Sequence, residues 1–89
     1  MITVYTKNLC PYCDGAKAYL DKLGEAYYAV NISENEDARE FLLDSGFKSV
    51  PQIFYRGQLL VEGGHAGLIK LMPADLTAAK NRINESVDR

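Results

Sequence analysis

Two cysteines separated by two residues are the most chemically active side chains of this chain. Cys10 and Cys13 are its only cysteines, and the segment that they bound is Cys-Pro-Tyr-Cys. A disulfide between them would close a loop too short to restrict the unfolded chain much, so a stabilising crosslink explains the pair poorly. Neighbouring thiols are suited to thiol–disulfide exchange, in which one thiolate attacks a disulfide and the second resolves the mixed disulfide.

The segments on either side of the pair predict how one thiol becomes reactive. Residues 2–6 are β-branched and aromatic and predict a strand, and Pro11 suits the first turn of a helix from about 11 to 23. Unpaired N–H groups at a helix N-terminus carry partial positive charge, and they lower the pKa of a thiol from about 8.5 to roughly 3.5–7.5. We therefore expect Cys10 to be the exposed nucleophile and Cys13, one turn further into the helix, to be the less exposed resolving thiol.

Two more side chains near the pair are candidates for the site. Lys7 would add positive charge near the sulfur of Cys10, although an ordinary solvated lysine explains this position equally well. Tyr12 would place an aromatic ring at the edge of the site, or be a simple surface residue. The pair also leaves metal binding open, either as half of a zinc site, with His65 as the one histidine of the chain, or as an iron–sulfur cluster shared between two chains.

The sequence after the first helix predicts the remainder of an α/β fold. Residues 26–32 predict a second strand, and a strand, a helix and a strand within about 30 residues are typical of a right-handed βαβ unit. Ser33 and Glu36 have the spacing of a capping box, which predicts a second helix that ends at Gly46. The side chains expected on the buried face of that helix are Ala38, Phe41 and Leu42.

The second half of the chain predicts a hairpin followed by helical sequence. Residues 52–55 and 58–61 are short strand-like runs with an Arg-Gly pair between them, which favours antiparallel pairing. Apolar residues at helical spacing extend over 65–86, as one kinked helix or as two helices around Pro73. The sequence thus predicts a four-stranded mixed β-sheet flanked by helices, in the order β-α-β-α-β-β-α.

Length, composition and charge exclude several classes of protein. The chain has 89 residues and is expected to form one domain over residues 1–89, because two cores would each be too small. No apolar run approaches the roughly 20 residues that a membrane span needs, and we see no secretory leader at the N-terminus. The net charge of −2 argues against nucleic acid or a polybasic membrane contact. Two closely spaced cysteines favour a reducing, cytoplasmic location.

The chain resembles the glutaredoxins of the dithiol type at three places in the same order. These places are Lys7 to Cys13, Ser49 to Gln52, and Gly63-Gly64, and the resemblance extends from Ile2 to about Met72. It implies the thioredoxin-like fold and an oxidoreductase that reduces glutathione mixed disulfides and protein disulfides with electrons from glutathione. It also implies a monomer without a permanently bound cofactor or metal, with ribonucleotide reductase among the candidate protein substrates.

The resemblance assigns roles to individual residues. Val50 would pair its backbone with glutathione in the manner of an added strand, with Pro51 in the cis form. Gly63 and Gly64 would let the backbone approach the γ-glutamyl end of the ligand. The catalytic residues are expected to be Cys10 and Cys13, and the residues expected to bind glutathione are Lys7, Tyr12, Ser49, Val50, Pro51, Gly63, Gly64, His65 and Ala66.

One short segment departs from the family pattern. Many dithiol glutaredoxins follow the two glycines with one residue and then one or two aspartates, whereas this chain continues with His65, Ala66 and Gly67. Ala66 offers only its backbone N–H, and His65 is left to take part in place of the missing acid. Two alternatives therefore stay open: an electron donor for ribonucleotide reductase that is reduced by thioredoxin reductase, and an iron–sulfur cluster-binding dimer.

Overall fold

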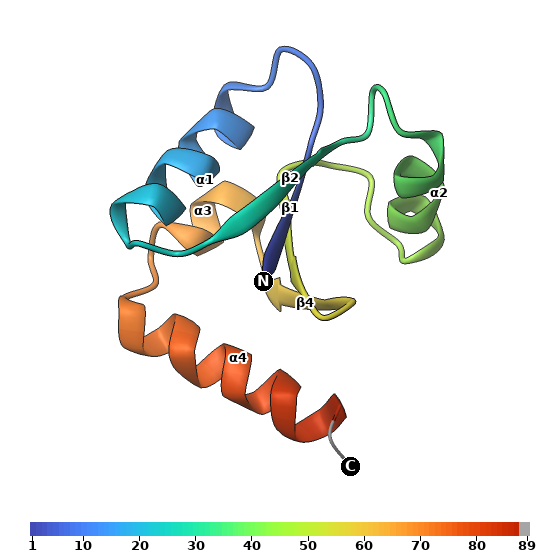
Figure 1. Ribbon diagram of the computed structural model, residues 1–89. Helices are drawn as coiled ribbons and strands as arrows, with labels where there is room; N and C mark the ends of the chain where they lie inside the picture. The colour runs from blue at the N-terminus through green and yellow to red at the C-terminus, as the bar shows by residue number, and fades with distance from the viewer. Residues whose placement is uncertain (88–89) are drawn as a thin grey trace.

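A four-stranded mixed sheet with helices on both faces forms the centre of the molecule (Figure 1). The strands are β1 (Ile2–Thr6), β2 (Tyr27–Asn31), β3 (Gln52–Tyr55) and β4 (Gln58–Val61), and the helices are α1 (Pro11–Lys22), α2 (Glu36–Asp44), α3 (Gly64–Leu68) and α4 (Pro73–Val87). The computed structural model describes residues 1–87, and the strands lie in the order β2-β1-β3-β4. This architecture confirms the mixed sheet flanked by helices that the sequence predicts.

The side chains of the central strand β1 alternate between the two faces of the sheet. It pairs in parallel with β2 through the crossover helix α1, as predicted for a βαβ unit, and antiparallel with β3. Ile2, Val4 and Thr6 are buried on one face of β1, and the residues between them are half-buried on the other. Because successive side chains of a strand point to opposite faces, the first of these faces is the main core side.

The main core lies between this face of the sheet and the helices α1, α3 and α4. The buried residues of α1 and α4 recur at helical spacing, so each of these helices presents one apolar stripe to the strands. Burial of apolar surface is the dominant favourable term in folding, so this layer holds the helices on the sheet. The members of the core are Ile2, Val4, Ala16, Leu20, Ile53, Leu60, Val61, Leu68, Leu76, Ala79 and Ile83.

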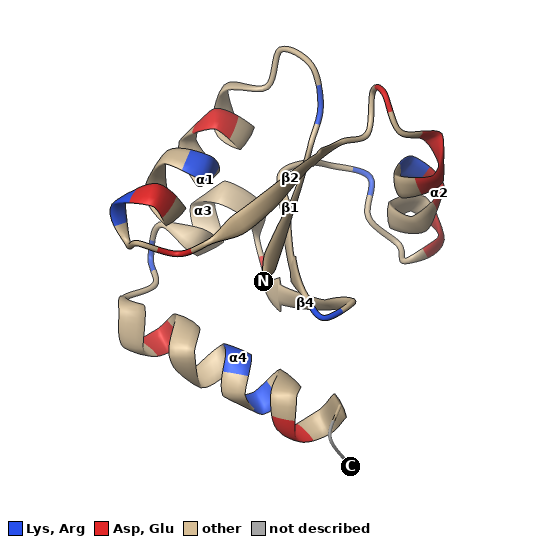
Figure 2. Ribbon diagram, in the orientation of Figure 1, with Lys and Arg blue, Asp and Glu red and all other residues tan. Residues whose placement is uncertain are grey.

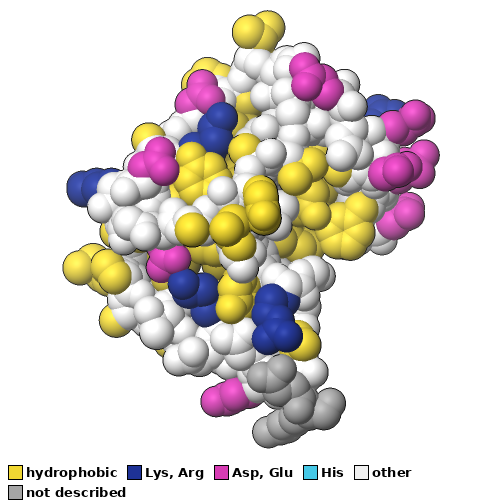
Figure 3. Space-filling view, in the orientation of Figure 1, with side chains coloured by type: hydrophobic (Ala, Val, Ile, Leu, Met, Phe, Trp, Pro, Cys, Tyr) yellow, Lys and Arg dark blue, Asp and Glu magenta, His cyan; other side chains and the backbone are white. Residues whose placement is uncertain are grey.

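Helix α2 covers the opposite face through aromatic contacts (Figure 1). The ring of Phe41 lies 5.9 Å from that of Tyr5 and 5.5 Å from that of Phe54, centroid to centroid. Leu42 is buried as predicted, but the prediction of a buried Phe41 is wrong, since its side chain is 39% exposed. The reason is that α2 is short and reaches only part of this face, where Tyr28 is also exposed. Hydrophobic side chains are visible across the middle of the surface in Figure 3.

The start of α2 differs from the predicted capping box. The N-cap is Asn35, whose side chain accepts the N–H of Ala38 at 3.0 Å. Ser33 lies outside the helix, and its hydroxyl accepts the backbone N–H of Asn8 at 3.1 Å. The serine is thus engaged by the loop after β1, which leaves the capping role to the asparagine. The first turn of α2 still carries acidic side chains, which interact favourably with the positive end of the helix dipole (Figure 2).

The hairpin of β3 and β4 forms as predicted. The two strands pair antiparallel around Arg56 and Gly57, which have φ angles of 52° and 79°. Left-handed conformations at both central residues are the requirement of the two-residue turn that matches the twist of paired strands. Glycine meets this requirement without strain at the second of the two positions.

The C-terminal sequence forms two helices, which answers the question that the sequence leaves open. α3 ends at Leu68, and Pro73 begins α4, where the missing N–H of proline breaks no helical hydrogen bond. The hydroxyl of Tyr19 donates to the carbonyl of Leu71 between these helices at 2.7 Å. Within the described residues, no helix combines the length and the apolar character needed to cross a membrane.

Candidate active site

The two cysteines lie at the N-terminus of α1, as predicted. Cys10 is the N-cap residue, with φ and ψ of −121° and 94°, and Pro11 follows in the first turn. The sulfur of Cys10 accepts the backbone N–H of Cys13 at 3.2 Å. A side chain at this position satisfies one of the N–H groups that have no partner within the helix. In the reduced protein we expect the same N–H group and the helix dipole to stabilise negative charge on this sulfur.

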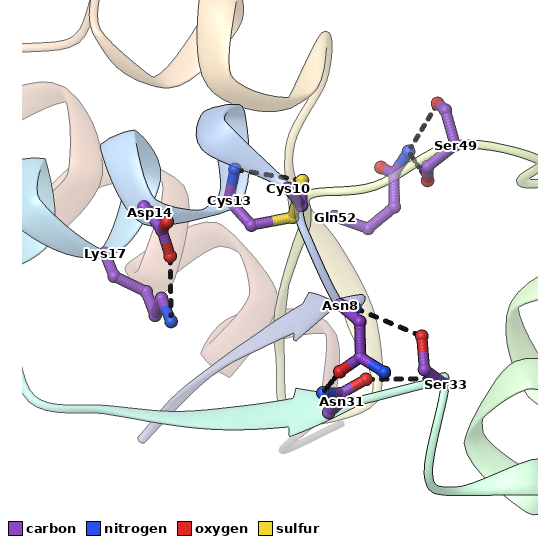
Figure 4. The surroundings of a disulfide bond; sticks show 9 residues. All are labelled: Asn8, Cys10, Cys13, Asp14, Lys17, Asn31, Ser33, Ser49 and Gln52. Atoms are coloured by element: carbon purple, nitrogen blue, oxygen red, sulfur yellow. Dashed lines mark hydrogen bonds and ion pairs between the residues drawn. A yellow bond between two sulfur atoms is a disulfide. The ribbon is translucent and has the colours of Figure 1, made fainter.

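The structure shows the oxidised state, with Cys10 and Cys13 joined in a disulfide (Figure 4). Cys13 is the less exposed of the two, as predicted, with 1% exposure against 7% for Cys10. Cys10 is nevertheless more buried than the exposed nucleophile that the sequence predicts. In this state the sulfur of Cys10 is bonded to that of the buried Cys13 and lies against the N–H group of the first helical turn.

A hydrogen-bonded loop fixes the segment that leads into Cys10 (Figure 4). The side chain of Asn31 donates to that of Asn8 at 2.8 Å, and the backbone N–H of Asn8 donates to Ser33. Leu9, which follows, has a φ of 54° and is 98% exposed. The sequence analysis did not identify these anchors. Two asparagines at the carboxyl ends of neighbouring parallel strands are the signal that could have revealed them.

Lys7 does not line the groove described below. It is exposed and lines a separate hollow with Arg39, at the start of α2. Glu34 and Glu36 line the same hollow, so the charges there are of both signs. Because Lys7 is not among the residues that line the groove, its contact with the ligand stays a prediction.

A groove of about 700 Å³ adjoins the turn that carries the disulfide. Tyr12, which stands between the two cysteines, forms part of its wall. All the residues expected to bind glutathione except Lys7 line this groove, although their contacts with a ligand stay predictions. The lining residues that the sequence analysis missed are Phe47, Gln52, Leu59 and Glu62.

The segment before β3 forms one wall of the groove. The Val50–Pro51 peptide bond is cis, as the resemblance predicts. The buried side chain of Gln52 donates through Nε2 to the carbonyl oxygen of Ser49 at 2.9 Å (Figure 4). This bond closes the loop over Val50 and fixes the course of the backbone. Val50 lies within this loop and lines the groove, and pairing of its backbone with a ligand in the manner of an added strand stays a prediction.

Gly63 and Gly64 form a second wall of the groove, where Gly63 is the N-cap and Gly64 the first residue of α3. Their φ angles are 88° and 58°, a region that glycine adopts without strain. A Cβ atom on Gly64 would lie 2.9 Å from the carbonyl oxygen of Pro51. The structure thus gives a reason for glycine here beyond an approach to a ligand, since the two walls of the groove meet at this point.

The charged groups of the groove are few. Among the described residues that line it, Glu62 and His65 are the acid and the base, and no lysine or arginine is present. Nor do any three His, Cys, Asp or Glu side chains within residues 1–87 come together as ligands for one metal ion. The resolved changes in pKa lie elsewhere: burial raises the pKa of Tyr5, and burial, together with Asp21, raises that of Tyr27.

Comparison with known proteins places these features in context. The family model for glutaredoxin matches residues 2–60. Glutaredoxin 3 of Escherichia coli is 41% identical over 58 residues, which are 64% of this chain and 70% of that protein.

Two solved structures are similar in fold as well as in sequence. NrdH-redoxin of Escherichia coli, a glutaredoxin-like protein with a thioredoxin-like activity profile, is 30% identical with a TM-score of 0.59, and the match covers 61% of this chain and 71% of that one. Wheat glutaredoxin is 28% identical with a TM-score of 0.69, and the match covers 88% and 79% of the two chains.

Proposed function

Because the chain belongs to the glutaredoxin family, a class of thiol–disulfide oxidoreductases, we propose that it reduces glutathione mixed disulfides and protein disulfides with electrons from glutathione. The observation that carries this proposal is the position of Cys10 as the N-cap of α1, with the N–H of Cys13 directed at its sulfur. After reduction the same N–H group faces a thiolate, which is the attacking species in disulfide exchange. Glutathione acts as a cosubstrate, and no permanently bound cofactor or metal is required.

With a glutathione mixed disulfide, the reaction needs only the first thiol. The thiolate of Cys10 attacks the sulfur of glutathione, a new disulfide forms between them, and the substrate leaves as a thiolate. The thiolate of a second glutathione molecule then attacks this mixed disulfide. Oxidised glutathione leaves, and the thiolate of Cys10 is restored.

With a protein disulfide, the second thiol completes the reaction. Attack by Cys10 forms a mixed disulfide with the substrate and releases one substrate thiolate. Cys13 then attacks the sulfur of Cys10, releases the second substrate thiolate and closes the disulfide seen in the structure. Two glutathione molecules reduce this disulfide and leave as oxidised glutathione. We expect ribonucleotide reductase among the protein substrates, a monomeric protein, and a reducing, cytoplasmic location.

A second candidate function concerns the source of electrons. The similarity to NrdH-redoxin, with its thioredoxin-like activity profile, favours reduction by thioredoxin reductase in place of glutathione. The absence of an acidic residue after Gly64 points in the same direction, because that position would receive the γ-glutamyl end of glutathione.

One experiment separates these two candidates. Reduction of a protein disulfide is followed with glutathione and glutathione reductase in one reaction and with thioredoxin reductase alone in another. We expect turnover that rises with the concentration of glutathione. Turnover with thioredoxin reductase and none with glutathione would establish the second candidate and overturn the first.

The iron–sulfur alternative has a test of its own. The chain is purified without oxygen, and its absorbance and its mass in solution are measured. We expect a colourless monomer. A brown dimer whose colour is lost in Cys10→Ser would contradict the proposal that no cofactor is bound.

A further inference from the structure

Leu9 is a hydrophobic side chain that the fold leaves almost fully in water. It is 98% exposed and directly precedes Cys10, whose exposure is 7%. Its backbone is left-handed, with a φ of 54°, a conformation that residues other than glycine, asparagine and aspartate rarely adopt. The side chain covers no part of the core, and the backbone favours other residue types. The internal packing of the fold therefore does not account for a leucine here.

The loop that carries Leu9 is held on both sides. Asn8, just before it, is hydrogen-bonded to Ser33 and to Asn31, and Cys10, just after it, is the N-cap of α1. Figure 1 shows this loop, between β1 and α1, at the end of the molecule away from α4. A partner that contacts the leucine therefore has to order little of the backbone, which keeps the entropic cost of the contact low.

Leu9 lies outside the groove, although it is next to the reactive sulfur. Tyr12, on the other side of Cys10 in the sequence, lines the groove, whereas Leu9 does not. A small disulfide that fits within the groove can thus react without touching the leucine. Leu9 is left to contact those parts of a substrate that extend beyond the groove, and in a protein substrate these parts are the residues around its cysteine.

The proposed reaction brings these residues close to Leu9. During reduction of a protein disulfide, the sulfur of Cys10 is bonded to a cysteine of the substrate. The Cα atoms of two bonded cysteines lie about 4.4–6.8 Å apart, and the Cα atom of Leu9 lies about 3.8 Å from that of Cys10. The neighbours of the substrate cysteine are therefore within reach of the leucine. An apolar neighbour would remove apolar surface of both partners from water, which favours binding.

We propose that Leu9 is a docking residue for protein substrates and that the chain prefers disulfides whose cysteines are flanked by an apolar side chain. This inference rests on the proposed reaction and adds to it a class of protein substrate. Leu9 acts on the binding of polypeptide and not on the sulfur of Cys10. Small disulfides without a peptide part therefore react equally well with and without it.

The test uses two short peptides, each closed by one disulfide and each with acetylated and amidated ends. They differ only in the residue next to each cysteine, which is leucine in one peptide and asparagine in the other. Excess reduced protein is mixed with each peptide in a single turnover, and the release of peptide thiols gives a second-order rate constant. The measured quantity is the ratio of the constant for the leucine peptide to that for the asparagine peptide. Bis(2-hydroxyethyl) disulfide is the probe without a peptide part.

Three substitutions at Leu9 separate its apolar character from its backbone conformation. In Leu9→Ala we expect the ratio to fall about threefold to tenfold, as when about one methyl or methylene group loses its apolar contact. Leu9→Asn suits the left-handed backbone but is polar, and we expect the same loss. Leu9→Met keeps an apolar side chain and should retain the ratio of the unmodified chain.

A matched control and two further measurements complete the experiment. Leu43→Ala removes a leucine of α2 that is 51% exposed and lies outside the groove, and it should retain the ratio. All four variants should react with bis(2-hydroxyethyl) disulfide at the rate of the unmodified chain. The midpoint of unfolding should be the same in Leu9→Ala as in the unmodified chain, because the side chain is exposed.

The outcomes distinguish failure of the inference from failure of the proposed reaction. Equal ratios in the unmodified chain and Leu9→Ala would overturn the docking role, and so would an equal loss in Leu43→Ala. Slower reaction of Leu9→Ala with all three probes would show that the leucine supports Cys10, and this too would overturn the inference. If the unmodified chain reacted with none of the probes, the proposed reaction itself would be overturned.

Discussion

At the scale of single residues, the site depends on one sulfur atom and one backbone N–H group. The donor to Cys10 is the N–H of Cys13, so the residue that resolves the mixed disulfide also helps to stabilise the thiolate that forms it. A backbone donor keeps its position whatever side chain is present. The stabilisation of Cys10 and the resolving role of Cys13 are therefore separable by mutation.

The roles of the two thiols give the first prediction. Cys10→Ser removes the nucleophile and should abolish reduction of both glutathione mixed disulfides and protein disulfides. Cys13→Ser retains the backbone N–H, so it should spare the reduction of mixed disulfides and block that of protein disulfides. Turnover of each substrate with glutathione checks this, and loss of both activities in Cys13→Ser would contradict the assigned order.

The sequence allows prediction of the site residues that are close to a motif, but not of those that depend on docking of distant elements. Cys10 and Cys13 were predictable because strand, cysteine pair and helix follow one another along the chain. The close approach of the His65 ring to Gly15 joins two residues fifty positions apart, and it exists only because α3 packs beside α1. The anchor from Asn8 to Ser33 likewise depends on the parallel pairing of β1 and β2.

At the scale of elements, α1 combines two demands at Gly15. Glycine in the middle of a helix costs about 0.5–1 kcal/mol relative to alanine, because it loses more backbone freedom on folding. In return, its missing side chain admits the ring of His65. The close approach of the His65 ring therefore explains why α1 has glycine at position 15, where alanine would favour the helix more.

The second prediction follows from these opposing effects. Gly15→Ala should raise the free energy of unfolding by up to about 1 kcal/mol, since the ring of His65 belongs to a flexible side chain that can move away. Chemical denaturation measures the change, with Ala18→Gly on the exposed side of α1 as a control of opposite sign. Lower stability of Gly15→Ala would show that the ring cannot move and that the contact supports the fold.

The aromatic contacts under α2 give the third prediction. Burial raises the pKa of Tyr5 above its ordinary value of 10.0, so the folded protein holds the phenol proton more tightly than the unfolded chain does. The stability that depends on a protonated Tyr5 is fully present below about pH 10, and it is lost as pH rises through the pKa of the folded protein. Tyr5→Phe should therefore reduce the loss of stability above about pH 10, as measured by denaturation at a series of pH values. An unchanged alkaline loss in the variant would assign it to other groups.

The prediction of elements was more successful for their existence than for their ends. Apolar spacing and turn residues correctly predicted the βαβ unit and the hairpin, because these signals are local. The capping box at Ser33 failed because the same hydroxyl has a partner in the loop after β1. Phe41 was expected to be buried because periodicity shows which side of a helix is apolar, but not how far the sheet extends beneath it.

At the scale of the whole molecule, one core joins the N-terminal strand to the C-terminal helix. Leu76 of α4 is fully buried in the same cluster as Ile2 and Leu20. The partly buried ion pair between Lys80 and Glu25, at 2.8 Å, connects α4 to the segment before β2. α4 therefore belongs to the same packing unit as the strands, although it lies outside the segment that the glutaredoxin model matches.

The fourth prediction tests whether the chain unfolds as one domain. Leu76→Ala removes buried methyl groups from the shared core and should lower the free energy of unfolding by about 2–5 kcal/mol. If the chain is one domain, circular dichroism and alkylation of the reduced cysteines should report the same shifted midpoint. Loss of helix signal at a lower denaturant concentration than exposure of the cysteines would show that α4 unfolds separately.

The position of the disulfide within a single helical turn has a consequence for how the protein meets its partners. Both sulfurs belong to the first turn of α1, so the bond links no two elements of the fold. Gaining or losing it therefore makes or breaks no crosslink between the layers of the fold. We therefore expect a substrate and a reductant to distinguish the oxidised from the reduced protein mainly by the chemistry of that one turn.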